Sequence, residues 1–206
     1  LSKIQTAHIP QIDKLDEESL MMQMETIQSI FLEKFLSCKK LKELETLQAR
    51  AFSKLSEQPW MNCHFDFERR NLMVDSSNEI AVIDFQDLCI GPVGIDLAGI
   101  IVDHYISYSD QLIDNALKHY VQCLQLDVSV KDVNEWLRWG GIQRNMRILG
   151  TLSNLYIQDN RTFRLRDLPG ILENLITLIP NDEFMSLKEH LSSAVMPKLH
   201  KELEAL

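Results

Sequence analysis

Side chains able to bind a metal ion or move a proton gather in one short window, CHFDFERRNLMVDSSNEIAVIDFQD, which runs from Cys63 to Asp87. Carboxylate and amide oxygens are the hard ligands that suit Mg²⁺, and Mg²⁺ commonly keeps waters or phosphate oxygens as its other ligands. A further carboxylate beside a metal-bound phosphate can accept the proton of an incoming hydroxyl group. Asp66, Asn71 and Asp84 therefore predict a phosphoryl-transfer site, in a window that also holds His64 and Asp87.

A β-hairpin is the element expected to position these side chains. The runs NLMV and EIAVI flank the turn-forming cluster DSSN, a pattern typical of two antiparallel strands. If the turn centres between Ser77 and Asn78, Asn71 lies opposite Asp84 and both oxygen ligands meet at the open end of the hairpin. Asp66 precedes Asn71 by five residues, so its loop is short enough to reach the same place.

The rest of the chain shows the spacing of amphipathic helices. We expect a mainly α (α+β) fold in which helices surround one small hairpin that carries the catalytic and metal-binding loops. Residues 1–15 read as irregular, and Ser109 and Ser129 are expected to cap the helices that follow them. The helices are expected at about 17–35, 41–55, 96–108, 110–124, 130–157, 168–180 and 181–206, the last with a break near Pro197.

Composition restricts the partners of the chain. Its 206 residues suffice for one sizeable domain or two small ones, and its net charge of −9, without a block of Lys or Arg, argues against nucleic acid or an anionic membrane surface. No apolar run reaches the roughly 18 residues of a membrane span, and the first residues lack the pattern of a signal peptide. The four cysteines form no CxxC pair, which favours reduced thiols and a cytoplasmic protein.

The motif H-x-D-x-x-x-x-N, followed by I-D-F, resembles the catalytic and metal-binding loops of the kinase-like superfamily, specifically its aminoglycoside phosphotransferase branch. The resemblance implies that Asp66 is the catalytic base and that Asn71 and Asp84 hold Mg²⁺. It also implies that His64 supports the catalytic loop from behind, and that Asp96, in GPVGIDLAG, braces that loop.

Further segments narrow the resemblance to the bacterial cell-wall amino-sugar kinases, namely RNLM, DFQD, GP…DLA and GGIQRNMRILGTLSNLYIQDN. Enzymes of this kind phosphorylate the anomeric hydroxyl of N-acetylmuramate and N-acetylglucosamine in peptidoglycan recycling. The resemblance implies ATP as donor and a small sugar as acceptor. Gln86 and Asp87 either line the acceptor pocket or terminate a strand, and Arg144 faces either the sugar or solvent.

One departure from the family concerns the nucleotide lobe. Nothing before His64 resembles its phosphate-binding strand Lys or covering loop, and the first glycine is Gly91. We therefore expect residues 1–206 to form the C-terminal lobe alone, with residues 1–15 a remnant of the inter-lobe linker and the absent nucleotide lobe its intramolecular partner. Such a lobe is expected to be inactive by itself.

Rival readings remain open. A kinase of the same fold could act on another hydroxyl, such as that of an aminoglycoside, choline or homoserine, and a non-catalytic helical binding or scaffold module is the alternative of a different class. A zinc site is disfavoured because no second His accompanies His64, and a D-x-D phosphatase is disfavoured because Asp84 and Asp87 are three residues apart. Arg69 and Arg70 either approach phosphate or pair with surface acids.

Overall fold

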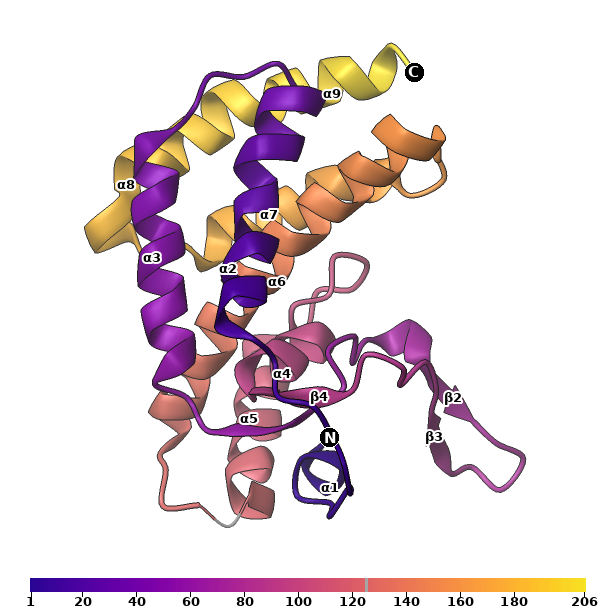
Figure 1. Cartoon of the computed structure of the whole chain (residues 1–206). Helices are drawn as coiled ribbons and strands as arrows, with labels where there is room; N and C mark the ends of the chain where they lie inside the picture. The colour runs from indigo at the N-terminus through magenta and orange to yellow at the C-terminus, as the bar shows by residue number, and fades with distance from the viewer. Residues whose placement is uncertain (125) are drawn as a thin grey trace. The chain divides into compact units, whose positions relative to one another are not determined.

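The chain folds into two compact units in a computed structural model that describes residues 1–124 and 126–206 (Figure 1). Unit 1 comprises Leu1–Asp16 and Lys54–Gly141, and unit 2 comprises Glu17–Ser53 and Ile142–Leu206. Two helices each contribute to both units: α3 (Lys42–Ser56) and α6 (Val130–Asp159). Most of the chain is helical, which confirms the predicted mainly α fold with a small β component.

Unit 1 holds both sheets. Its helices are α1 (Ser2–Gln5), α4 (Gly94–Ile101), α5 (Asp110–Leu124) and the first part of α6. Its strands are β1 (Trp60–Cys63), β2 (Leu72–Val74), β3 (Ile80–Val82) and β4 (Cys89–Pro92).

The predicted hairpin exists as the antiparallel pair β2–β3, but a second two-stranded sheet was missed. In that sheet β1 pairs antiparallel with β4, from Trp60 opposite Pro92 to Cys63 opposite Cys89. The two strands are four residues long and 25 residues apart, so no local turn signal announces their pairing. The expectation of a single hairpin is therefore wrong, and the hairpin is instead an extension between two paired strands (Figure 1).

The predicted register of the hairpin is also wrong, by one residue. Leu72 lies opposite Val82, so Asn71 faces Ile83 rather than Asp84, and the Ile83 N–H donates to the Asn71 carbonyl at 3.0 Å. The cause is the turn, in which the Asp75 carboxylate accepts hydrogen bonds from the N–H groups of Ser77 and Glu79, both at 2.8 Å. This loop centres on Ser77 and shifts the opposing strand by one position.

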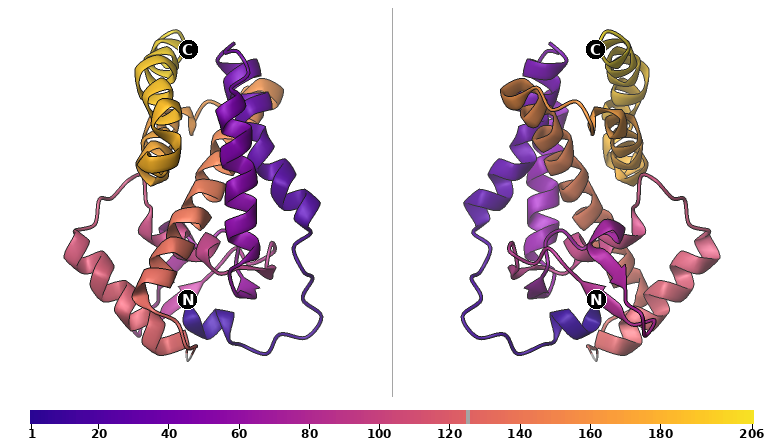
Figure 2. Two further views of the ribbon diagram at one scale, coloured as in Figure 1. Left: turned by 90° about the vertical axis from the view of Figure 1, so that its left-hand side faces the viewer. Right: turned by 90° about the vertical axis from the view of Figure 1, so that its right-hand side faces the viewer.

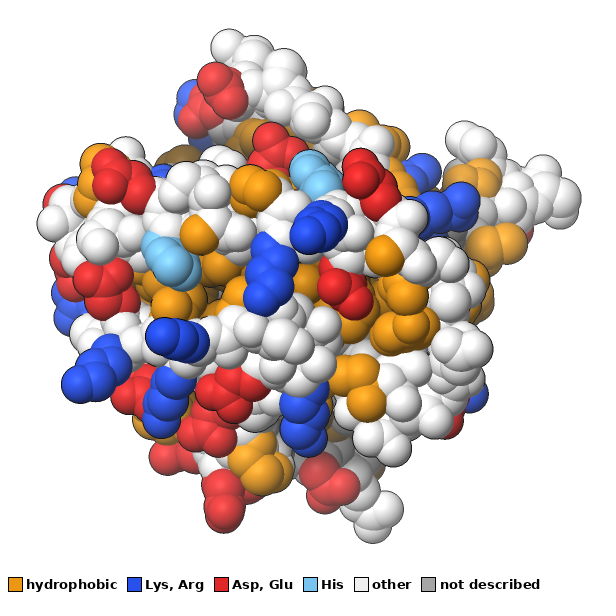
Figure 3. All heavy atoms as spheres, turned by 90° about the horizontal axis from the view of Figure 1, so that it is seen from above, with side chains coloured by type: hydrophobic (Ala, Val, Ile, Leu, Met, Phe, Trp, Pro, Cys, Tyr) orange, Lys and Arg blue, Asp and Glu red, His pale blue; other side chains and the backbone are white. Residues whose placement is uncertain are grey.

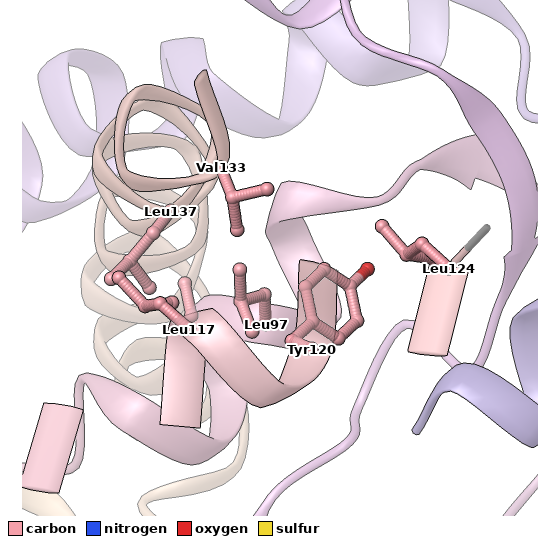
Figure 4. Close-up of a cluster of buried hydrophobic side chains, with 7 residues drawn as sticks. Leu97, Leu117, Tyr120, Leu124, Val133 and Leu137 are labelled. Atoms are coloured by element: carbon pink, nitrogen blue, oxygen red, sulfur yellow. The ribbon is translucent and has the colours of Figure 1, made fainter. Parts of the chain in front are cut away.

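The core of unit 1 forms where α4, α5 and α6 meet. Leu97, Leu117 and Leu137, one from each helix, cluster with Val133, and Tyr120 lies between Leu97 and Leu124 (Figure 4). The Tyr120 hydroxyl donates to Gln5 Oε1 of α1, also in unit 1, at 2.6 Å. Burying these apolar side chains fixes α4, whose first turn carries Asp96.

Two glycines allow α4 and α6 to approach at their backbones. A Cβ added at Gly94 would lie 2.0 Å from the Trp136 carbonyl oxygen, and one added at Gly140 would lie 2.1 Å from the Gly94 backbone. Real Cβ atoms do not approach other atoms so closely. Gly140 therefore allows the middle of α6 to make close backbone contact with the start of α4.

Unit 2 contains only helical elements among its described residues. These are α2 (Glu17–Thr26) with the π-helical continuation Ile27–Phe35, most of α3, the second part of α6, α7 (Leu168–Leu178), α8 (Asn181–His190) and α9 (Met196–Glu204). Figure 2 shows the C-terminal helices of this unit in two side views. Its core side chains include Leu20, Met24, Phe31, Leu44, Leu47, Ile142, Met146 and Leu172.

Several helix boundaries differ from the predictions. The α4 helix ends at Ile101 instead of near Tyr108, because Val102 leaves helical geometry at φ −92° and ψ 66°. Near Pro197, where a break was expected, the structure has a π-helical segment, Leu191–Val195, just before α9. Pro197 lies in the first turn of α9, where its lack of a backbone N–H leaves no helical hydrogen bond unmade. Residues 1–15, expected to be irregular, include the short α1.

The predicted serine caps of α5 and α6 are confirmed. Ser109 Oγ accepts the Leu112 N–H at 3.3 Å, and Ser129 Oγ accepts the Asp132 N–H at 3.2 Å. Asp132 in turn accepts the Ser129 N–H at 2.9 Å, so the start of α6 carries the reciprocal capping arrangement that stabilises helix N-termini.

Within residues 1–124 and 126–206, no helix is both long enough and apolar enough to cross a membrane. Basic and acidic side chains are interspersed over the face of the molecule seen in Figure 3.

Candidate active site

The loop between β1 and β2 brings Asp66 and Asn71 together. A 3₁₀ turn, Arg69–Asn71, folds the chain back so that Asn71 Nδ2 donates to the Asp66 carbonyl at 2.9 Å and lies 3.4 Å from the Asp66 carboxylate. Asn71 is buried and Asp66 is half-buried. The amide nitrogen of Asn71 thus holds the Asp66 loop, while its Oδ1 is the atom of this side chain suited to a cation.

Asp96 ties the start of this loop to α4. Its Oδ2 accepts the His64 N–H at 2.6 Å and its Oδ1 accepts the Phe65 N–H at 2.8 Å. Phe65 has φ 71°, a left-handed conformation that is costly for a bulky residue and persists only when neighbours impose it. The carboxylate of Asp96, which is 0% exposed, imposes it by bonding two successive N–H groups.

Burial raises the pKa of the Asp96 carboxyl above its usual range, even though hydrogen bonds from the His64 and Phe65 N–H groups and the Cys63 thiol favour the charged form. Desolvation therefore outweighs the three donors. The buried Asp96 carboxyl thus accepts two backbone hydrogen bonds from the Asp66 loop in spite of this desolvation.

His64 connects the loop to the strand that leads to Asp84. Its ring is buried at 1% exposed, with Nε2 3.0 Å from the Ile83 carbonyl and its edge near the Phe67 ring. The Ile83 carbonyl can only accept, so Nε2 carries the proton. Nδ1 has no hydrogen-bond partner among the described residues. The ring thus links the loop to Ile83, and its role in supporting the loop stays a prediction.

Asp84 follows directly after Ile83, whose two backbone polar groups bind His64 and Asn71. Its side chain is exposed, and its φ of 68° places it in the left-handed region that Asp tolerates better than most residues. Although Asp84 is not the cross-strand partner of Asn71, it stands one residue beyond that partner. The structure therefore brings Asn71 and Asp84 to the same open end of the hairpin.

The donor set fits Mg²⁺ better than a metal that demands a full protein cage. Within the described ranges 1–124 and 126–206, no group of three or more His, Cys, Asp or Glu side chains is arranged to hold a metal ion. Mg²⁺ needs fewer protein ligands, because it is usually held by one or two carboxylates together with waters and phosphate oxygens. The Asn71 amide and the Asp84 carboxylate provide the few protein ligands that Mg²⁺ needs. A zinc ion would need three or four protein ligands.

Comparison with protein families bears on this arrangement. The model of the phosphotransferase enzyme family matches residues 15–127, more than half of the chain and all of the loops between His64 and Asp96. The chain belongs to the phosphotransferase enzyme family.

Curated relatives of this phosphotransferase carry one name. The N-acetylmuramate/N-acetylglucosamine kinase of Neisseria meningitidis serogroup B is 28% identical over 59% of this chain and 37% of its own length. The protein of the same name from Pseudomonas aeruginosa is 29% identical over 66% of this chain and 42% of its own length, and that of Pseudomonas putida is 27% identical over 54% and 34%. The chain thus spans less than half the length of the curated relatives it matches.

Gln86 and Asp87 lie in the turn that leads from Asp84 into β4. The Leu88 N–H donates to the Phe85 carbonyl at 3.1 Å, which places both residues at the exposed centre of a β-turn. They do not terminate a strand, because the described strand β3 ends earlier, at Val82. A role in binding the acceptor stays a prediction.

Arg144 lies in unit 2, on α6, apart from the other predicted site residues in the division of the chain. It is 3% exposed, so the alternative of a solvated helix face is wrong. Its contact with a substrate stays a prediction.

Sequence reasoning missed the segment that follows α4. Arg69 Nε pairs with Asp103 Oδ2 at 3.3 Å, and its guanidinium lies 5.7 Å from the centre of the Tyr105 ring. Arg70 forms an ion pair with Glu68. Both arginines of this loop therefore bind acids, as the second interpretation predicted, but the acids are not on the surface, since Glu68 is buried and the Asp103 side chain is 8% exposed. The early end of α4 at Ile101 is the feature that frees Asp103 and Tyr105 to reach the loop.

An apolar pocket of unit 1 lies elsewhere. It has a volume of about 450 Å³ and is lined by side chains of α4 and α5, among them Leu97, Ile101, Leu112 and Tyr120. None of the predicted site residues lines it. Its lining offers few groups for binding phosphate, so its size does not identify it as the site of phosphoryl transfer.

Proposed function

We propose that the chain carries the catalytic machinery of a kinase that moves the γ-phosphoryl group of ATP to a hydroxyl of a small sugar. The observation that carries the proposal is the junction of the two loops: Asn71 bonds Asp66 through its side chain and Ile83 through its backbone, directly beside Asp84. The printed names of the curated relatives point to the acceptor, N-acetylmuramate or N-acetylglucosamine, and the anomeric hydroxyl is the position that the sequence resemblance implies.

In the proposed reaction, Asp66 orients the acceptor hydroxyl and receives its proton. The acceptor oxygen forms a bond to the γ-phosphorus as the bond from that phosphorus to the bridging oxygen of ATP breaks, and ADP leaves. Asn71 Oδ1 and the Asp84 carboxylate hold Mg²⁺, which neutralises charge on the phosphates when bound. Because this transition state is loose, the chain contributes mainly by positioning these groups. Gln86 and Asp87 are proposed contacts of the sugar.

We further propose that the chain is the C-terminal lobe of a longer kinase and is inactive without the lobe that covers the nucleotide. Its extent, less than half that of the curated relatives, supports this view. So does the apolar surface of the β2–β3 hairpin, where Met73, Val74 and Ile80 are 52%, 64% and 68% exposed. Use of ATP and of recycled cell-wall sugars would place the enzyme in the cytoplasm.

The proposal is tested with the full-length protein that contains this chain, ATP, Mg²⁺ and N-acetylmuramate. We expect Asp66→Asn and Asp84→Asn each to lower kcat by about 10²- to 10⁴-fold, the range typical for loss of a positioned base or charge. Asp114→Asn, an exposed change on α5 that removes a carboxylate paired with Lys118, is the matched control and should leave kcat unchanged. Near-wild-type turnover in either site variant would remove the role assigned to that residue.

A panel of acceptors separates the proposed substrate class from the alternatives. If the same protein prefers an aminoglycoside, choline or homoserine over amino sugars, the site is retained but the acceptor is wrong. If it neither binds ATP nor phosphorylates any member of the panel, the non-catalytic binding module takes the place of the kinase.

A further inference from the structure

Cys63 and Cys89 form a directly opposed cysteine pair at the base of the candidate active site. They are the last residue of β1 and the first residue of β4, and each is the other's cross-strand partner. We propose that this pair is a redox modification site, at which a peroxide oxidises the two thiols to a reversible disulfide. The proposal goes beyond the phosphotransfer chemistry and does not depend on it.

The sheet already provides the geometry of a disulfide. Residues directly opposite in an antiparallel pair have Cα atoms about 4.5–5.5 Å apart, and disulfides span Cα separations of about 4.4–6.8 Å. Both sulfurs also lie on one face of the sheet, because a Cβ added at Gly91 would stand 3.7 Å from Cys89 Sγ and 3.8 Å from Cys63 Sγ. The absence of a side chain at Gly91 leaves this space to the two thiols.

The two thiols differ in access and in acidity. Cys63 is fully buried, whereas Cys89 is half-buried and can be reached by a small oxidant. Contact with the Cys63 side chain lowers the pKa of Cys89, while burial raises the pKa of Cys63. Cys89 is therefore the attacking thiolate and Cys63 the resolving thiol.

The oxidation balances in two steps. The Cys89 thiolate attacks hydrogen peroxide, so that an S–O bond forms, the O–O bond breaks and the departing hydroxide takes up a proton to become water. Cys63 then attacks the sulfenic acid, so that the S–S bond forms, the S–O bond breaks and the thiol proton leaves with the hydroxide as a second water. Two electrons pass from the thiols to the peroxide.

A disulfide between Cys63 and Cys89 would change the contacts of the adjacent Asp66 loop. Cys63 immediately precedes His64, and its thiol is one of the donors to the buried Asp96 carboxylate. Oxidation removes that donor and ties the start of the catalytic loop to the strand that follows Asp87. The other two cysteines have different surroundings: Cys38 lies in unit 2, and Cys123 is on α5 beside His119.

The test uses the full-length protein that contains this chain, hydrogen peroxide, alkylation of the remaining thiols and tryptic peptide mapping. Trypsin cleaves at Arg69 and Arg70, which places the two cysteines on separate peptides, 55–69 and 71–118. We expect a linked mass of these two peptides, loss of two alkylatable thiols per chain, and recovery of both with dithiothreitol.

Matched variants assign the bond. Cys123→Ser and Cys38→Ser should still form the linked peptide, and Cys89→Ser should not form it and should keep Cys63 reduced. A half-buried Ser in place of Cys89 is a small change, so this variant is expected to fold, which circular dichroism checks. Unlinked peptides after peroxide, over-oxidised Cys89 beside alkylated Cys63, or a bridge to Cys38 or Cys123 would each overturn the proposal.

Discussion

The two loops of the candidate active site are built differently. The Asp66 loop, residues 63–71, is largely buried and is held by Asp96, by the side chain of Asn71 and by the start of α4 behind it. The Asp84 loop, residues 83–88, is mostly exposed and is fastened at its first residue, where the Ile83 backbone bonds His64 and Asn71. One loop is preorganised by the core of unit 1, and the other depends on the first.

This difference suits the roles proposed for the two loops. A base must stand at a fixed place beside the acceptor, and such preorganisation is a major source of rate. A cation ligand can complete its geometry when metal and phosphates arrive, because the bound ion itself orders the carboxylate. We therefore expect ligand binding to order the Asp84 loop far more than the Asp66 loop.

Each loop also contains one residue in the left-handed region, Phe65 at φ 71° and Asp84 at φ 68°. Strained backbone of this kind tends to occur at functional sites. The strain at Phe65 is held by a hydrogen bond from its own N–H to Asp96, while Asp84 is a residue type that accepts this conformation readily. The left-handed residue of the Asp66 loop therefore depends on a contact with another element, whereas that of the Asp84 loop does not need one.

The largest effect on stability is expected from Asp96→Ala. This change leaves the N–H groups of His64 and Phe65 without their acceptor in a buried site, and each such loss costs about 1–3 kcal/mol. Removal of the desolvated charge offsets part of the cost, so the free energy of unfolding should fall by about 3 kcal/mol in urea denaturation. Asp87→Ala, in the exposed loop, should change it by less than about 0.5 kcal/mol. If the two substitutions lowered the free energy of unfolding equally, the two loops would not differ in how firmly they are held.

A smaller effect is expected from His64→Phe, which keeps an aromatic ring and removes the donor to Ile83. The free energy of unfolding should fall by about 1 kcal/mol, the net worth of one hydrogen bond. Hydrogen exchange at the Ile83 amide should become faster, because the strand end that precedes Asp84 loses one of its two attachments. His119→Phe on α5, an exposed position, is the control. Unchanged exchange at Ile83 would show that the second loop does not depend on the first in this way.

The smallest effect is a pH dependence that arises from Asp96. Its pKa is raised in the folded protein, so its contribution to stability is fully present below its unfolded value of about 4 and is lost as pH rises through the folded pKa. The difference in unfolding free energy between the wild type and Asp96→Asn should therefore decrease from about pH 4 to pH 7. Urea titrations at several pH values measure it. An increase over the same range would mean that the donors, rather than burial, dominate at this carboxyl.

Much of the fold follows from local patterns. Amphipathic spacing predicted the helices, the side chains of Ser109 and Ser129 predicted two caps, and the alternation around DSSN predicted the hairpin. The β1–β4 sheet was missed because its pairing joins short segments across 25 residues, and the hairpin register was missed because the Asp75 side chain sets the turn. Contacts of these kinds depend on geometry that periodicity does not encode.

For the candidate site, the sequence by itself determined which residues were of interest. The spacing of one motif, visible without the structure, identifies His64, Asp66, Asn71, Asp84 and Asp96. Only the tertiary structure decided how they are held. It showed Asp96 bonding two successive backbone N–H groups, His64 bonding the residue before Asp84, and Arg69 paired with Asp103 from a segment freed by the early end of α4. The physical reason is that a motif lists donors and acceptors, whereas burial and backbone direction decide which of them meet.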